Sequence, residues 1–330
     1  NSDGVRQWGT YYGGSEYEYG WGISCNGNGN VFVTGATYST TGIATIGAHQ
    51  ETYAGGVVDA FVVKFNSDGV RQWGTYYGGS EYDHGYGISC DTVGNIFVTG
   101  YTQSTTGIAT IGAHQETNAG GVYYEDAFIV KFNSNGVRQW GTYYGGSGNE
   151  EGHGISCDRN GNVFVTGGTH STTGIATIGA HQETYTSPGD AFVVKFNSNG
   201  VRQWGTYYGG NEGDQGFGIS CDTVGNVFVT GYTYSTNGIA TIGAHQETYS
   251  GGYEDAFVVK FNSTGIRQWG TYYNGGSHDF GQGISCDVNG NVFITGYTYS
   301  TNGFATSGAH QEILAGGCDA FIARFSTCDI

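Results

Sequence analysis

The chain has 330 residues, with 63 Gly, 26 Tyr, 18 Phe and 6 Trp but only 1 Pro and no Met. This composition excludes a helical fold, because each Gly inside a helix costs about 1 kcal/mol relative to Ala, while the many aromatic residues indicate a chain that folds. The formal net charge is −17 with basic residues scattered singly, which argues against a nucleic acid or an anionic membrane as partner. No apolar run approaches the roughly 18 residues of a membrane span.

The sequence repeats itself five times, and each copy begins with the frame V/I-R-Q-W-G-T-Y-Y. The copies run over residues 1–65, 66–132, 133–196, 197–261 and 262–325, followed by a short tail, 326–330. Repetition of this kind is typical of proteins in which each copy buries its surface against its neighbours. We therefore expect a single domain that spans residues 1–330.

The first expected strand, Val5–Tyr12, contains the first copy of the frame. In the second copy the pattern predicts strands at 87–90, 95–99 and 126–132, and the next frame predicts a fourth at 137–140. Turns that contain Asn or Asp together with Gly join these strands into two hairpins per copy. The last expected strand is Asp319–Phe325.

Four antiparallel strands per copy, apolar on both faces, predict an all-β five-bladed β-propeller. A flat solenoid is the alternative. The sequence opens with a strand of the fourth type, Val5–Tyr12, and its last strand, Asp319–Phe325, is of the third type. We expect these two segments to pair, which would complete the fifth sheet, close the ring and remove two exposed edges.

The copies differ mostly in the long links that connect their hairpins, and these links are expected on one face of the propeller. Loops held by a rigid scaffold often carry binding residues, so the varied face is the candidate for partner contact. Two aligned positions vary most clearly. The residues predicted to contact a partner are Trp21, Tyr86, His153, Phe217 and Gln282 at the first position, and Tyr38, Gln103, His170, Tyr234 and Tyr299 at the second.

Three recurring frames carry a resemblance to a known family: G-I-S-C-D-x-x-G-N-V-F-V-T-G-Y-T, G-A-H-Q-E-T, and D-A-F-V-V-K-F-N-S-x-G-V-R-Q-W-G-T-Y-Y-G-G. Together they resemble the SBBP (β-propeller) repeat of bacterial secreted proteins, across all five copies. The resemblance implies a propeller fold and an exported, extracellular setting at a bacterial cell surface. It implies no reaction, since the family offers no catalytic residues to carry over.

An acidic residue recurs in the frame acid-x-Gly-x-Gly, as Glu18, Asp83, Glu150, Asp214 and Asp279. We expect these carboxylates to gather near the mouth of the propeller's central channel. Two interpretations remain open. Each carboxylate accepts hydrogen bonds from loop N–H groups, or the converging oxygen atoms bind a cation such as Ca²⁺.

The seven cysteines do not follow a disulfide pattern. Cys25, Cys90, Cys157, Cys221 and Cys286 hold the same place in successive copies and are expected to be too far apart to bond. We predict that they are buried free thiols that act as small hydrophobic side chains. Cys318 and Cys328 flank the last strand, about 30 Å apart in an extended chain, so either is expected to pair with a missing segment or another chain.

Two further repeated groups have a binding and a packing interpretation. The histidines of Ala-His-Gln-Glu could form a five-fold ligand site, or they pack within loops. The Trp and Tyr side chains of the frame could form a sugar platform, or they pack between blades.

Three functional classes remain. The first is a non-enzymatic module that binds a glycan or a protein through exposed aromatic side chains. The second is a structural spacer of a surface stalk or filament, held by self-association. The third is a carbohydrate-active enzyme, which the sequence favours least because every prominent carboxylate recurs and no Gly-x-Ser-x-Gly or His-Glu-x-x-His motif occurs. We expect the first class, with no cofactor other than the candidate Ca²⁺.

Overall fold

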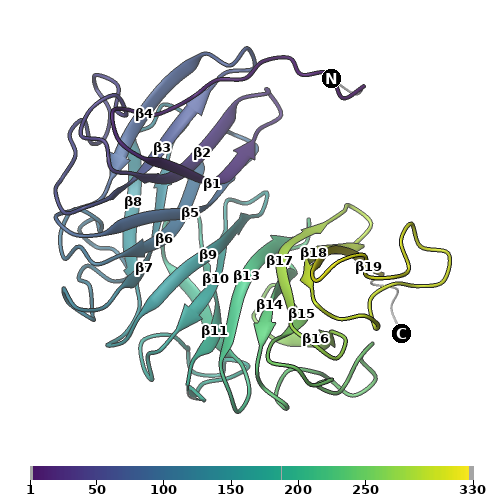
Figure 1. The fold of residues 1–330 in the computed structure, drawn as a ribbon. Helices are drawn as coiled ribbons and strands as arrows, with labels where there is room; N and C mark the ends of the chain where they lie inside the picture. Colours follow the sequence, from purple (N-terminus) through teal and green to yellow (C-terminus); the bar gives the residue numbers. More distant parts are fainter. Residues whose placement is uncertain (1–2, 187, 327–330) are drawn as a thin grey trace. The chain divides into compact units, whose positions relative to one another are not determined.

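The structure, a computed structural model, describes residues 3–186 and 188–326. Its regular elements are antiparallel strands arranged in five sheets, and the chain divides into an N-terminal unit, 1–144, and a C-terminal unit, 145–330 (Figure 1). The all-β prediction is confirmed, and five sheets agree with a five-bladed propeller. The single-domain organisation stays a prediction.

The N-terminal unit contains two four-stranded sheets in which each strand pairs with the next along the chain. The first sheet comprises β1 (Glu18–Cys25), β2 (Val31–Thr37), β3 (Asp59–Phe65) and β4 (Arg71–Tyr77). The second comprises β5 (Asp83–Cys90), β6 (Ile96–Thr102), β7 (Asp126–Phe132) and β8 (Arg138–Tyr144). The first strand of the second sheet therefore begins four residues before the predicted start at residue 87.

The C-terminal unit contains three sheets with the same strand order. The third sheet comprises β9 (Glu150–Cys157), β10 (Val163–Thr169), β11 (Asp190–Phe196) and β12 (Arg202–Tyr208). The fourth comprises β13 (Asp214–Cys221), β14 (Val227–Thr233), β15 (Asp255–Phe261) and β16 (Arg267–Tyr273). The fifth comprises β17 (Asp279–Cys286), β18 (Val292–Thr298) and β19 (Asp319–Phe325).

The hairpin turns follow the predicted chemistry. Between β3 and β4, the side-chain Oδ1 of Asn66 accepts hydrogen bonds from the N–H groups of Asp68 and Val70, at 3.0 and 2.9 Å. Gly69 takes φ +77°, a conformation that costs glycine nothing. Between β5 and β6, Asp91 accepts the equivalent hydrogen bonds from the N–H groups of Val93 and Asn95, and Gly94 takes the positive φ.

Fourth strands fasten neighbouring sheets together. In the N-terminal unit, the Trp73 indole N–H on β4 donates to the Ser134 carbonyl at 3.2 Å, beyond β7 of the second sheet. The Tyr77 hydroxyl donates to the Ile108 carbonyl at 2.8 Å, also in the second sheet. Both rings lie against Phe132, so the apolar core lies between successive sheets as well as within them.

The fifth sheet corrects one part of the sequence prediction. It has three strands, β17-β18-β19, rather than four, and β19 forms its edge. Residues 5–12 are not assigned to a strand. Instead, Trp8 donates to the Ser67 carbonyl at 2.9 Å and Tyr12 donates to the Ile43 carbonyl at 2.8 Å, the contacts that Trp73 and Tyr77 make one sheet later. Pairing of residues 5–12 with β19 is not shown, and closure of the ring stays a prediction.

The predicted repeat boundaries stay predictions, but the ends of the five copies coincide with ends of strands. Copies one to five end at Phe65, Phe132, Phe196, Phe261 and Phe325, the last residues of the third strands. The tail 326–330 lies outside the described residues except for Ser326. Over the described part of the chain, no helix is long and apolar enough to cross a membrane.

Candidate functional site

The first variable position is a β-bulge in all five sheets. In the first sheet, Gly20 pairs with Gly35 and Gly22 pairs with Thr34, so Trp21 is the extra residue of β1. The same shift makes Tyr86, His153, Phe217 and Gln282 the extra residues of the other first strands. A bulge re-aims a side chain and is a common feature beside functional sites.

Glycines make the bulge sterically possible. A Cβ on Gly35, opposite the bulge, would lie 1.8 Å from the Tyr19 carbonyl oxygen. A Cβ on Gly22 would lie 2.7 Å from the carbonyl oxygen of Tyr86, the bulge residue of the second sheet. Within each unit, the bulges of neighbouring first strands therefore approach each other through glycine, which places their variable residues side by side.

In the N-terminal unit the bulge residues belong to a row of aromatic rings. The Trp21 ring centroid is 4.8 Å from that of Tyr86 and 5.3 Å from that of His84, on which it stacks. His84 in turn stacks on Tyr101 at 4.7 Å. The Tyr19 ring also stacks on Trp21, with the two ring centroids 6.0 Å apart. Trp21 is 44% exposed, so an aromatic face is open to solvent.

A comparable row runs through the C-terminal unit. His153 stacks on Phe217 at 4.7 Å, and Phe217 lies 5.7 Å from Tyr232. Tyr232 contacts Phe280 at 5.3 Å. Gln282 is exposed and has no aromatic ring. The variable position thus carries a different surface in each sheet, on a backbone that is the same in all five.

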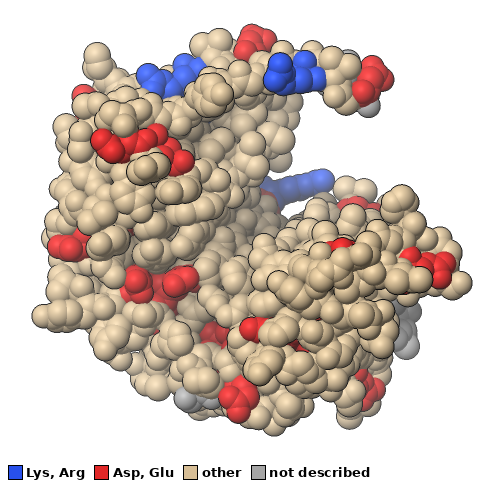
Figure 2. Space-filling view, in the orientation of Figure 1, with Lys and Arg blue, Asp and Glu red and all other residues tan. Residues whose placement is uncertain are grey.

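The histidines in these rows are neutral at physiological pH. Burial lowers the pKa of His84 and of His153 to about 4. His153 Nε2 lies 2.7 Å from the Gln215 amide nitrogen, so the unprotonated ring nitrogen accepts a hydrogen bond. Acidic side chains outnumber basic ones and stand in separate places on the face drawn in Figure 2. The aromatic and histidine side chains of both rows are therefore uncharged, within an acidic protein.

The second variable position contacts loops of its own sheet. The Gln103 amide donates to Glu125 at 3.0 Å, His170 Nδ1 lies 2.9 Å from the Pro188 carbonyl oxygen, and the Tyr234 hydroxyl donates to Glu254. Tyr38 and Tyr299 instead make edge contacts with neighbouring rings. All five residues follow the second strand of a sheet, next to the loop before the third. Both sets of predicted contact residues stay predictions as binding residues.

The recurring acidic residues stand at the start of the first strands and are held within their own sheets. Asp83 accepts from the Gly79 N–H at 2.8 Å and the Ser104 hydroxyl at 2.9 Å, and also from Thr102. Asp214 and Asp279 have equivalent donors, Glu150 accepts from Gly146 and Thr169, and Glu18 accepts from Thr37. This geometry supports the hydrogen-bonding interpretation.

The described residues contain no group of three or more His, Cys, Asp or Glu side chains placed to hold a metal ion. Because hydroxyl and amide donors already surround Asp83 and Asp214, their oxygen atoms have little left to offer a cation. Burial raises the pKa of both carboxyls to about 7. The predicted Ca²⁺ site stays a prediction, without a ligand cluster behind it.

Sequence reasoning missed a second set of buried carboxyls, at the start of the third strands. Asp59 on β3 and Asp255 on β15 are fully buried, and Oδ1 of each has no hydrogen-bond partner. Burial raises the pKa of Asp59 to about 7 and that of Asp255 to about 8. The signal was present, because an Asp precedes Ala-Phe in every copy.

The histidines of Ala-His-Gln-Glu pack in the loops. The His49 ring lies 6.1 Å from Tyr77 and 5.7 Å from Phe132, and burial lowers its pKa to about 4. Glu51 accepts a hydrogen bond from the Gly47 N–H at 2.8 Å. The same contacts recur in other copies, so the structure supports the packing interpretation over a five-fold ligand site.

The cysteines of the described residues are free thiols, so the absence of disulfides among them is confirmed. Their predicted burial is corrected. Cys25 is exposed, and Cys90, Cys157, Cys221 and Cys286 are half-buried. The Ser24 hydroxyl donates to Cys90 at 3.3 Å, because the two first strands lie close. Cys318 is exposed, Cys328 lies outside the described residues, and their pairing stays a prediction.

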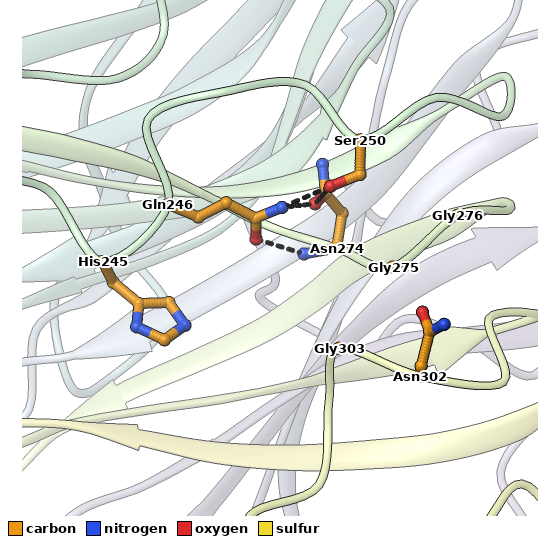
Figure 3. Close-up of a pocket in the computed structure, with 8 residues that line it drawn as sticks. All are labelled: His245, Gln246, Ser250, Asn274, Gly275, Gly276, Asn302 and Gly303. Carbon is orange, nitrogen blue, oxygen red and sulfur yellow. Dashed lines mark hydrogen bonds between the residues drawn. The ribbon is translucent and has the colours of Figure 1, made fainter.

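A polar pocket of about 370 Å³ lies between the fourth and fifth sheets (Figure 3). Asn274 lies here in place of the Gly that other copies have after Tyr-Tyr. Its backbone N–H donates to the Gln246 side chain at 3.1 Å, and its side-chain oxygen accepts from Ser250 at 2.7 Å. Asn274 also donates to Asp255. These contacts hold Asn274 to the loop before β15, so the side chains of Gln246, Ser250 and Asn274 hydrogen-bond to one another.

The sheets, their shared bulge and their repeating frames define an all-β repeat protein. The β-propeller repeat model SBBP matches four segments, residues 72–107, 139–174, 203–239 and 268–304. Each segment runs from a fourth strand, through the first two strands of the following sheet, into the next loop. The chain belongs to the SBBP β-propeller repeat family, with four matched repeats where the sequence itself shows five copies.

Other similarities are more distant. The chain is 23% identical over 301 residues to an uncharacterized WD repeat-containing protein, L264, of Acanthamoeba polyphaga mimivirus, covering 73% of this chain and 21% of that protein. The chain thus spans about a fifth of that relative's length.

Among solved structures, a Xanthomonas campestris gluconolactonase is 10% identical with a TM-score of 0.37, covering 94% of this chain and 87% of that one. A putative gluconolactonase is 11% identical with a TM-score of 0.38, covering 85% and 86%. Likenesses this weak carry no argument about activity.

Proposed function

We propose that this chain is a non-catalytic, extracellular propeller module of a bacterial surface protein that binds a glycan or a protein. The observation behind the proposal is that the most variable position is the bulge residue in every sheet. The family resemblance is the support for the extracellular setting. The repeated backbone supplies a scaffold, and the bulge residue supplies the difference between copies.

The aromatic rows suit such binding. Trp21, Tyr86 and Tyr101 offer large contact area, and their closely packed rings have little rotamer freedom to lose on binding. The neutral His84 within the row adds no charge that would repel a ligand. Similar rows in both units suit weak contacts that add up over several sheets.

Absence of catalysis is part of the proposal. An enzyme site needs residues with distinct environments. Here the prominent carboxylates, such as Asp83 and Asp214, have almost the same donors and the same raised pKa. No cofactor is proposed.

A glycan array and a panel of extracellular matrix proteins test the proposal. Trp21→Ala and Tyr86→Ala are expected to weaken binding about tenfold or more each, since aromatic anchors dominate interfaces. Tyr11→Ala is the matched control, because Tyr11 is fully exposed and lies outside the rows. Unchanged binding in both bulge variants would contradict the proposal, as would product release from a polysaccharide panel.

A second candidate function, a structural spacer held by self-association, has its own observation. Ile46, Ile111, Ile178 and Ile242 are 98–99% exposed at the tips of equivalent turns. In the first copy, Ala48 donates to the Thr45 carbonyl at 3.1 Å and Gly47 takes φ +80°, so the turn presents Ile46 rigidly. The fifth copy has Ser307 at this place.

Isoleucine-to-serine changes at all four tips test the spacer function. Ser307 shows that the turn accepts serine, since Ala309 still donates to the Thr306 carbonyl at 3.0 Å. If these four isoleucines hold separate molecules together, sedimentation velocity is expected to show assemblies of the native chain and single chains of the variant. A native chain that remains monomeric at high concentration would rule out this function.

A further inference from the structure

An aromatic pocket of about 410 Å³ lies at the loop end of the fourth sheet in the C-terminal unit. Its lining residues are Pro188, Glu212, Gly213, Tyr234, Tyr249, Gly252 and Tyr253. Its volume falls in the range of small-ligand sites. Three tyrosines line the pocket together with Gly213, which stands at the start of the fourth sheet, directly before Asp214.

The pocket exists because an aromatic side chain found in other copies is missing here. The residue directly before the recurring acid is Tyr17, Tyr82, Asn149 or His278 in four copies, and Gly213 in this one. In the first copy, the Tyr17 ring lies edge-on to Tyr38 at 6.5 Å. In the fifth, His278 lies edge-on to Tyr299 at 5.7 Å. Gly213 leaves the equivalent place beside Tyr234 open.

The walls of the pocket are held by contacts with one another and with neighbouring residues. The Tyr249 hydroxyl donates to the Tyr253 carbonyl at 2.7 Å. The Tyr253 ring stacks on His278 at 5.0 Å, and Tyr234 is held by its hydrogen bond to Glu254. Burial, and then this hydrogen bond, raise the pKa of Tyr234, so its hydroxyl stays protonated. A pocket of this kind loses little entropy on binding.

The chemistry of the pocket points to a neutral ring with polar substituents. Tyrosine faces carry negative potential and attract C–H groups. The exposed carboxylate of Glu212 at the rim accepts hydroxyl hydrogen bonds and repels anions, as does the net charge of −17.

We propose that this pocket binds one uncharged hexopyranose ring of a glycan, with the sugar's C–H face against Tyr253 and Tyr234 and its hydroxyl groups toward Glu212. The proposal rests on the binding function above and names its ligand class at Tyr234, one of the predicted contact residues. The hexopyranose takes the place that an aromatic or amide side chain takes in the other four copies.

The sharpest test fills the pocket with the side chain that other copies carry. Gly213→Tyr is compatible with the fold, because a Cβ on Gly213 would lie 3.5 Å from Tyr234, an ordinary contact, and the backbone has no positive φ. Tyr253→Ala removes a wall that is 68% exposed and serves as the second variant. Gly276→Ser is the control, because its Cβ would meet nothing within 4 Å.

The probes are methyl glucopyranoside, methyl galactopyranoside and N-acetylglucosamine, with N-acetyltyrosinamide as a flat ligand that is not a sugar. Binding of each probe is measured by saturation-transfer NMR. At least one sugar is expected to bind the native chain and the control, and to bind Gly213→Tyr and Tyr253→Ala about tenfold more weakly. Circular dichroism verifies that each variant folds.

Three results would overturn the inference. They are equal sugar binding in Gly213→Tyr, tighter binding of N-acetyltyrosinamide than of any sugar, and no sugar binding at all. None of them decides the proposed binding function, which depends on the Trp21 and Tyr86 variants. Loss of partner binding in those variants with unchanged sugar binding in Gly213→Tyr would retain the function and reject the pocket.

Discussion

The carboxyl groups of Asp59 and Asp83, on neighbouring sheets, both face the backbone of Gly78. A Cβ on Gly78 would lie 3.0 Å from Asp59 Oδ1 and 2.5 Å from Asp83 Oδ2. Burial raises the pKa of each carboxyl to about 7, and repulsion from the Asp83 carboxylate raises the pKa of Asp59 further. The junction between the first two sheets therefore holds protons that the unfolded chain would release.

Stability is expected to fall as the pH rises from 6.5 to 8.5. A carboxyl with a folded pKa near 7 and an unfolded pKa near 4 stabilises the fold at low pH, and this contribution is lost as the pH rises to its folded pKa. Between pH 6.5 and 8.5 the loss is about 0.8 kcal/mol for a carboxyl with a folded pKa of 7 and about 2 kcal/mol for one with a folded pKa of 8. Urea unfolding at several pH values measures it, and a free energy that rises over this range would contradict the assignment.

The window above pH 6.5 avoids an opposing effect. The pKa of His49 and of His84 is lowered from 6.5 to about 4, so their contribution to stability increases with pH mostly between about 4 and 6.5 and levels off about one pH unit higher. Asp59→Asn is the control, since its amide oxygen can still accept from Gln50 and Ala54. This variant is expected to have a shallower pH dependence than the native chain.

Gly78→Val is expected to destabilise the chain by about 2 kcal/mol, because its side chain would collide with two buried carboxyls. Gly78→Asn is expected to cost less, since Asn274 occupies this place in the last copy and donates to Asp255 there. Chemical denaturation compares the two variants. If Gly78→Asn lowered the free energy of unfolding as much as Gly78→Val, the surroundings of Gly78 and of Asn274 would not be equivalent.

Gly22→Ala is expected to destabilise the N-terminal unit by about 1–3 kcal/mol, because its methyl group would press on the Tyr86 carbonyl oxygen at 2.7 Å. Gly20→Ala, on the other side of the bulge, has only Val33 at 3.7 Å and is the matched control. Thermal unfolding separates them. Equal melting temperatures would mean that the first strands are less closely packed than the structure shows.

Thiol reactivity is expected to follow exposure. Cys25 and Cys318 are exposed, whereas burial raises the pKa of Cys221 to about 12 and keeps it a thiol. In a timed reaction with a maleimide followed by peptide mass spectrometry, Cys25 and Cys318 are expected to react first. Fast labelling of Cys221 in the folded chain would contradict the packing of β13.

The repeats allowed the sheets and their hairpin turns to be predicted. Asn66 and Gly69 form the predicted turn, and Phe65 ends both a repeat and a strand. The bulge at Trp21 was missed, because strand periodicity alone does not show an extra residue, although the flanking glycines were a signal.

The candidate site was predicted less completely. The pocket beside Gly213 depends on what that copy lacks, and only spatial contact shows which side chains surround the gap. The contact between Asp59 and Asp83 was also missed, since the two residues lie 24 positions apart in the sequence and meet only where sheets adjoin. The expected pairing of residues 5–12 with β19 depended on long-range geometry that repetition alone does not specify.

The sequence repeat and the folded sheet are out of phase by one strand, because β4 lies in the second sequence copy but pairs with β3 in the first sheet, and its Trp73 and Tyr77 reach into the following sheet. Recombination that inserts or deletes a whole repeat would recreate the same junction wherever it occurred. Array length can therefore change between generations without any redesign of the interior, while substitutions at the bulge diversify each new copy.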